Sequence, residues 1–121
     1  MIRVLVVDDH TLMRRTLRAV LDGQPDLGVI GEADDGIEAI RLCQTVRPDV
    51  VLMDVDMPRM DGIETARQLR GIVPESCIIG MSSDSSGWVE SAFLSAGARA
   101  FLPKEMVPAH LLEVIRRECS L

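Results

Sequence analysis

The sequence predicts a single doubly wound α/β domain, in which one five-stranded parallel sheet is flanked by five helices. Two observations support this prediction. Short apolar runs alternate with longer segments in which apolar residues recur every three or four positions, the pattern of strands alternating with helices. The chain has 121 residues, which is the usual size of one domain and is long enough to bury a core.

Five short apolar runs are the predicted strands. The first, third and fourth lack polar alternation, as expected for strands that are buried on both faces of a sheet. The runs cover residues 2–7, 29–33, 50–53, 78–81 and 100–102.

A helical period of apolar residues follows each run, and five helices are therefore predicted. Pro108 suits the first turn of the fifth helix. We expect His10 to lie near the start of the first helix without taking part in chemistry. The residues that mark the helices are Met13, Leu17, Val20 and Leu21; Ala39, Cys43 and Val46; Ile63, Ala66 and Arg70; Ala92 and Phe93; and Leu111, Leu112 and Ile115.

The charge and hydropathy of the chain restrict its partners. The formal net charge is −6, which argues against direct nucleic-acid binding because such binding needs a basic surface. The basic pairs Arg14-Arg15 and Arg116-Arg117 are expected on solvated helix faces. No apolar stretch approaches the roughly 20 residues of a membrane span, and "MIRVLVVDDH" does not resemble a signal peptide. We therefore expect a cytoplasmic protein that does not contact membranes.

The three cysteines are expected to be unpaired. Cys43, Cys77 and Cys119 show no metal-binding spacing, their number is odd, and each has apolar neighbours. They are predicted to be small residues in or near the core of a protein from a reducing compartment.

Polar residues follow the predicted strands where each one ends. Asp8 and Asp9 follow the first strand, Asp54 the third, Ser82 the fourth and Lys104 the fifth. Ligands of such sheets bind beyond the carboxyl ends of the strands. Clustered carboxylates repel one another unless a cation lies among them, and a few aspartates with open positions suit Mg²⁺ and a phosphoryl group.

Four motifs carry a resemblance to a known family. They are "VLVVDDH", "DVVLMDVDMPRMDGIE", "IIGMSS" and "AGARAFLPKE". With them, the chain resembles the receiver domain of two-component response regulators over residues 1–121. The resemblance implies a flavodoxin-like sheet with strand order 2-1-3-4-5 and no output domain within these residues.

The resemblance also implies a phosphoacceptor and a metal site. Asp54 would accept a phosphoryl group from a sensor histidine kinase or a histidine phosphotransfer protein. Asp9 would bind Mg²⁺ directly and Asp8 largely through water. Asp54 itself and the backbone carbonyl of Asp56 would complete the protein's share of the metal ligands.

Three further residues would convert phosphorylation into a change of surface. Lys104 would pair with Asp54 and later with the phosphoryl group, and Ser82 would turn toward a phosphoryl oxygen. Phe101 matches an aromatic switch position, and plain packing is the competing interpretation. The surface formed by the fourth helix, fifth strand and fifth helix, or another helical face, would support a homodimer or another partner.

The resemblance favours a signalling switch over an enzyme. Its motifs look most like those of transcription regulators that carry a C-terminal helix-turn-helix domain, and the receiver would only assist its own phosphorylation and dephosphorylation. A second interpretation is a Mg²⁺-dependent hydrolase of the haloacid-dehalogenase type, because Asp54-Val55-Asp56 resembles the DxD motif of that superfamily. Against it, Pro58 stands where that motif has Thr or Val.

Overall fold

One parallel sheet with helices on both faces makes up the protein, as a computed structural model shows for residues 1–84 and 86–119. The strand order is β2-β1-β3-β4-β5, so the predicted fold class and order are confirmed. The strands are β1 (Ile2–Val7), β2 (Leu27–Ala33), β3 (Val50–Asp54), β4 (Cys77–Ser82) and β5 (Ala100–Pro103). The helices are α1 (Thr11–Asp22), α2 (Gly36–Val46), α3 (Gly62–Ile72), α4 (Gly87–Ala96), the short 3₁₀ helix η1 (Lys104–Met106) and α5 (Val107–Glu118).

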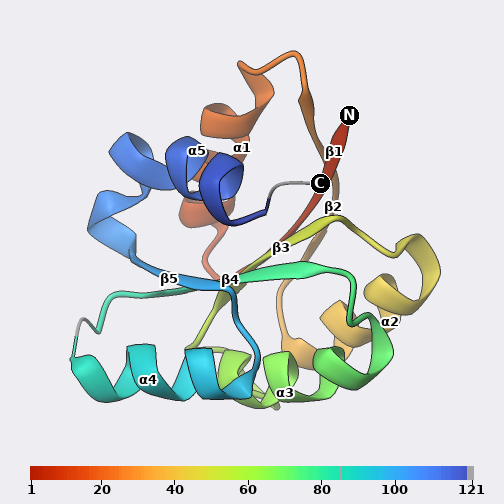
Figure 1. Cartoon of the computed structure of the whole chain (residues 1–121), viewed down its shortest axis with the longest axis vertical. Coiled ribbons are helices and arrows are strands. Elements are labelled where there is room, and N and C mark those ends of the chain that lie inside the picture. The colour runs from red at the N-terminus through yellow and green to blue at the C-terminus, as the bar shows by residue number, and fades with distance from the viewer. Residues whose placement is uncertain (85, 120–121) are drawn as a thin grey trace.

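The helices form two layers, with α1 and α5 on one face of the sheet and α2, α3 and α4 on the other (Figure 1). Successive side chains of a strand point to opposite faces. Val4 and Val6 of β1 therefore pack in the cluster beneath α1 and α5, while Leu5 and Val7 pack in the cluster beneath the other three helices. This double burial explains why the first strand shows no polar alternation.

All five predicted helices are present, and the strands differ from the prediction only at their ends. β2 begins two residues earlier, at Leu27. β3 continues through Asp54 because this residue pairs with Met81 of β4, and β4 continues through Ser82, which pairs with Pro103. The parallel ladder thus includes the polar residues at the strand ends. Within the described ranges, no helix has the length and apolar character needed to cross a membrane.

Cys77 and Cys119 form a disulfide, so the expectation that all three cysteines are unpaired is wrong. Cys77 is the first residue of β4, and Cys119 follows the last turn of α5. The packing of α5 on the sheet brings their Cα atoms to 5.6 Å across 42 positions of sequence, a proximity that no local pattern reveals. Cys43 is free and buried, and burial raises the pKa of its thiol to about 11.

Candidate functional site

The carboxyl edge of the sheet gathers the charged residues that the sequence placed there. The Lys104 ammonium lies 3.0 Å from Oδ2 of Asp8 and 3.1 Å from Oδ1 of Asp54. Asp8 is fully buried and Asp54 is 1 % exposed. Asp9 completes the acidic group. One carboxylate oxygen from each of Asp8, Asp9 and Asp54 and one ring nitrogen of His10 all lie within 4.8 Å of one another.

Asp54 is positioned by the backbone hydrogen bonds of the residue that follows it, Val55. The N–H of Val55 donates to the carbonyl of Met81 at 3.2 Å, and the N–H of Gly62 donates to the carbonyl of Val55 at 3.0 Å. Gly62 begins α3, and a Cβ at this position would overlap the carbonyl of Asp54. The absence of a side chain at Gly62 therefore allows α3 to begin directly against the end of β3.

The negative charges of the carboxylates at this edge are only partly balanced by the Lys104 ammonium. Burial, reinforced by the negative charge of Asp8, raises the pKa of Asp54 to about 6, although the Lys104 ammonium and the backbone N–H of Asp56 act in the opposite direction. Burial also disfavours the protonated form of Lys104, yet its two carboxylate partners raise its pKa above the ordinary value. Oδ2 of Asp8 and Oδ1 of Asp54 share the single ammonium of Lys104, and among the described residues Oδ2 of Asp54 has no hydrogen bond of normal geometry.

Such buried acceptors without hydrogen bonds fit a divalent cation. Buried charges are expensive unless they are paired or bind a metal. Carboxylate oxygens are the ligands that Mg²⁺ prefers, usually with several waters retained. The residues at this edge therefore suit a hard cation, and a cation there would lower the repulsion between Asp8, Asp9 and Asp54.

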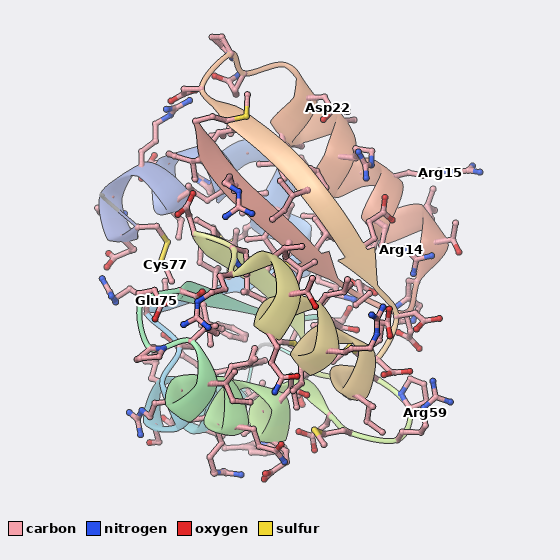
Figure 2. All side chains as sticks on the ribbon, turned by 90° about the vertical axis from the view of Figure 1, so that its right-hand side faces the viewer. Arg14, Arg15, Asp22, Arg59, Glu75 and Cys77 are labelled. Carbon is pink, nitrogen blue, oxygen red and sulfur yellow. A yellow bond between two sulfur atoms is a disulfide. The ribbon has the colours of Figure 1, made fainter. Side chains whose placement is uncertain are left out.

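Arg14 supports the acidic pair, which the sequence did not predict. Its Nη1 donates to the carbonyl of Asp8 at 2.6 Å, and its Nε donates to Glu32 of β2 at 2.9 Å. The prediction that the Arg14-Arg15 pair lies on a solvated face is therefore wrong for Arg14, whose side chain is only 20 % exposed. It holds for Arg15, which extends away from the ribbon (Figure 2).

Ser82 lies beside the acidic group at the end of β4. It is fully buried, and it comes one residue after Met81, the partner of Asp54 in the sheet. Its hydroxyl accepts a hydrogen bond from the N–H of Asp84 at 2.9 Å. The same hydroxyl can still donate its proton, so it retains the capacity to meet an anionic oxygen.

Phe101 connects β5 with α4. Its side chain is half-buried and packs against the cluster that contains Phe93, with 6.1 Å between the two ring centroids. Phe93 in turn covers Gly80, where a Cβ would lie 2.6 Å from the ring. Gly80 pairs with Phe101 in the sheet. The packing of Phe101 is thus observed, while a switching role stays a prediction.

His10 and Asp56 lie on the two loops that flank Asp54. The prediction that His10 lies near the start of α1 is confirmed, but its Nδ1 reaches the acidic group, at 2.9 Å from Asp8 and 3.1 Å from Asp9. Its position directly after the acidic pair was the available signal. The exposed side chain of Asp56 lines a hollow of about 400 Å³ that Trp88 of α4 also lines.

Comparisons with known proteins agree with this geometry. The model of the response regulator receiver domain family matches residues 4–116, and the chain belongs to this family. The transcriptional regulatory protein LiaR of Bacillus subtilis (strain 168) is 42 % identical over 116 residues, which are 96 % of this chain and 55 % of LiaR. The chain thus spans about half the length of this relative.

Two further similarities cover nearly the whole chain. A protein-glutamate methylesterase/protein-glutamine glutaminase of Pyrococcus abyssi is 42 % identical over 119 residues, which are 97 % of this chain and 31 % of that protein. The crystal structure of the response regulator domain of Thermotoga maritima CheB superimposes with a TM-score of 0.91 at 33 % identity, covering 100 % of this chain and 98 % of that one.

Replacing Asp54 by Asn should stabilise the metal-free protein in a pH-dependent way. The native pKa of about 6 exceeds the unfolded value of 3.8, so the native state binds more protons between these values and loses stability as the pH rises. Above pH 6 the cost of the ionised group is about 2–3 kcal/mol. In urea unfolding without divalent ions, Asp54→Asn should raise the free energy of unfolding by about that amount at pH 8 and leave it unchanged below pH 4.

Asp34→Asn is the matched control, because it removes an exposed carboxylate at the end of the edge strand β2. It should leave the free energy of unfolding nearly unchanged across the same pH range. A pH-independent gain in Asp54→Asn, or a loss of stability, would contradict the description of Asp54 as a buried carboxylate with insufficient compensation.

Replacing Gly62 by Ala should disturb both the fold and the site. The added Cβ would overlap the backbone carbonyl of Asp54, which cannot move without distorting the end of β3. The free energy of unfolding should therefore fall by at least about 2 kcal/mol. Gly71→Ala in the same helix meets nothing within 4 Å and should be neutral or gain up to about 1 kcal/mol. Equal effects of the two substitutions in urea unfolding would show that the close approach at Gly62 is unimportant.

Proposed function

We propose that this receiver domain is a phosphorylation-activated switch that accepts a phosphoryl group on Asp54 from a histidine kinase or a histidine phosphotransfer protein. The observation that carries the proposal is the buried carboxylate of Asp54, whose Oδ1 contacts the Lys104 ammonium and whose Oδ2 has no hydrogen bond among the described residues. Membership of the receiver family gives this carboxylate its chemical context.

In the proposed reaction, a carboxylate oxygen of Asp54 attacks the phosphorus of a phosphohistidine. A new O–P bond forms, the N–P bond breaks, and the electron pair stays on the leaving imidazole. Lys104, 3.1 Å from Oδ1 of Asp54, is placed to lose one carboxylate partner and gain the phosphoryl oxygens. Phosphoryl transfer depends mainly on such positioning and charge stabilisation.

The metal expected at this edge is Mg²⁺. Its proposed ligands are Asp9, Asp54 and the backbone carbonyl of Asp56, with Asp8 acting largely through water. A bound Mg²⁺ supplies positive charge that reduces repulsion between the carboxylates and the incoming phosphoryl group. The buried oxygens of Asp8 and Asp54 that have no hydrogen bond among the described residues support this assignment.

The proposed output is a rearrangement of the surface formed by α4, β5 and α5. The phosphoryl group adds acceptor oxygens, and the hydroxyl of Ser82 is the uncharged donor that the sequence predicts for them. The hydrogen bond from Asp84 to Ser82 connects this residue with the loop before α4. Phe101 and Phe93 then form the packed route between β5 and α4.

The output activity is proposed to belong to a partner or to a domain outside these residues. The relative LiaR is a transcriptional regulatory protein, which favours transcription regulation in the cytoplasm, with DNA bound by another domain. The methylesterase relative shows that similar receivers also occur in proteins of other activities. The receiver itself is then not an enzyme, and the α4–β5–α5 surface or another helical face would form any homodimer.

Labelling with a small phosphodonor tests the proposal. With acetyl phosphate and Mg²⁺, the wild-type domain should take up at most one phosphoryl group per chain, detected by mass spectrometry. Asp54→Asn should take up none, because its side chain lacks the nucleophilic carboxylate, while Asp34→Asn should be labelled like the wild type. Retained labelling of Asp54→Asn would move the acceptor elsewhere, and rapid multiple turnover of phosphomonoesters would favour the hydrolase interpretation.

A further inference from the structure

We propose that His10 is a direct ligand of the cation, so that the site combines an imidazole nitrogen with carboxylate oxygens. The inference rests on the metal site of the proposed function and extends it to the choice of metal. It predicts that the protein binds first-row transition ions such as Mn²⁺ and Ni²⁺ with an affinity that an all-oxygen site would not provide.

The distances around His10 match a coordination shell. In an octahedral site with bonds of about 2.1 Å, neighbouring ligand atoms lie about 3.0 Å apart and opposite ones about 4.2 Å apart. Nδ1 of His10 lies 3.1 Å from Oδ1 of Asp9 and 3.8 Å from Oδ2 of Asp54, one near the first value and one between the two. One cation can therefore contact the ring nitrogen and both of these oxygens with small adjustments. Oδ1 of Asp8 lies 2.9 Å from the same nitrogen, which leaves Asp8 its role through water.

The backbone places the imidazole at this point. His10 is the residue that precedes the first turn of α1, in an extended conformation. Its backbone N–H donates to Oδ1 of Asp8 at 2.8 Å, which fixes the base of the side chain beside a fully buried carboxylate. The ring itself is 59 % exposed, so it can turn slightly toward an ion without disturbing the core.

An independent observation points to a ligand at the same position. Asp54 is 99 % buried, and among the described residues neither of its carboxylate oxygens has a hydrogen bond. Its Oδ2 lies 3.8 Å from Nδ1 of His10, and Asp54 is one of the four residues whose ligand atoms gather there. An acceptor that is buried in this way requires a positive partner, and Lys104 contacts the other oxygen, Oδ1.

The ligand atoms at the site determine which cations bind more tightly when His10 takes part. Mg²⁺ prefers oxygen ligands and keeps its waters, so an imidazole adds little to its affinity. Imidazole suits the later first-row ions, whose affinities rise from Mn²⁺ through Ni²⁺. His10 should therefore raise the affinity for Ni²⁺ and Mn²⁺ relative to Mg²⁺. In the competing arrangement, Nδ1–H only donates a hydrogen bond to Asp8 and no nitrogen reaches the ion.

Pulsed electron paramagnetic resonance of bound Mn²⁺ separates these arrangements. The chain has two histidines, and His110 is exposed on α5, so His110→Asn is the matched control for His10→Asn. An Asn at position 10 keeps an N–H donor but removes the imidazole. The ¹⁴N modulation of an imidazole ligand should be present in the wild type and in His110→Asn, and absent from His10→Asn.

Calorimetric titration gives a second measurement. His10→Asn should weaken Ni²⁺ binding at least about tenfold and change Mg²⁺ binding by less than about threefold. Oxygen-only Mn²⁺ in the wild type, or equal losses for both ions in His10→Asn, would overturn the proposal. Labelling of Asp54 with Mg²⁺ would be unaffected by that result, so the proposed function would stand. The wild-type spectrum decides the question even if a variant fails to fold.

Discussion

Two buried carboxylates, those of Asp8 and Asp54, share the ammonium of Lys104 at one edge of the sheet. The parallel arrangement imposes this crowding, because all strands end at the same edge. Burial raises the pKa of Asp54 to about 6, which shows that ionising this carboxylate in the folded protein is unfavourable. Burying these carboxylates lowers the free energy of unfolding of the metal-free protein. A bound cation would restore that stability by neutralising their charge. The site is thus responsive to charge because its own charges are poorly compensated.

The same packing connects the site with the surface. Asp54 is backed by Gly62 at the start of α3, and Ser82 is tied to the loop before α4 through Asp84. Phe101 packs against Phe93 of α4. These contacts connect the acidic group with α3 and α4 and join β5 to α4, so the proposed phosphoryl group would act on the helical layers through them. The disulfide of Cys77 and Cys119 closes a loop that contains α4, β5 and α5, the elements expected to change.

Most of the fold followed from the sequence because apolar periodicity directly reflects burial. The strand ends supplied Asp8, Asp54 and Lys104 as neighbours for the same reason. Contacts that depend on tertiary geometry did not follow. The Cys77–Cys119 bond and the hydrogen bond from Arg14 to the carbonyl of Asp8 join residues whose proximity no local pattern encodes. The contact of His10 with the acidic group did not follow either, because a position at the start of a helix says nothing of the direction of the ring.

A crystal structure at saturating Mg²⁺ would show whether the buried carboxylates hold a cation. It should contain an octahedral ion among Asp8, Asp9 and Asp54, with bonds of about 2.1 Å to Asp9, Asp54 and the backbone carbonyl of Asp56. Lys104 should remain in contact with Asp54. If the three carboxylates point apart, or if no ion lies among them at saturating concentration, then the buried charge is not a cation site and the proposed switch loses its basis.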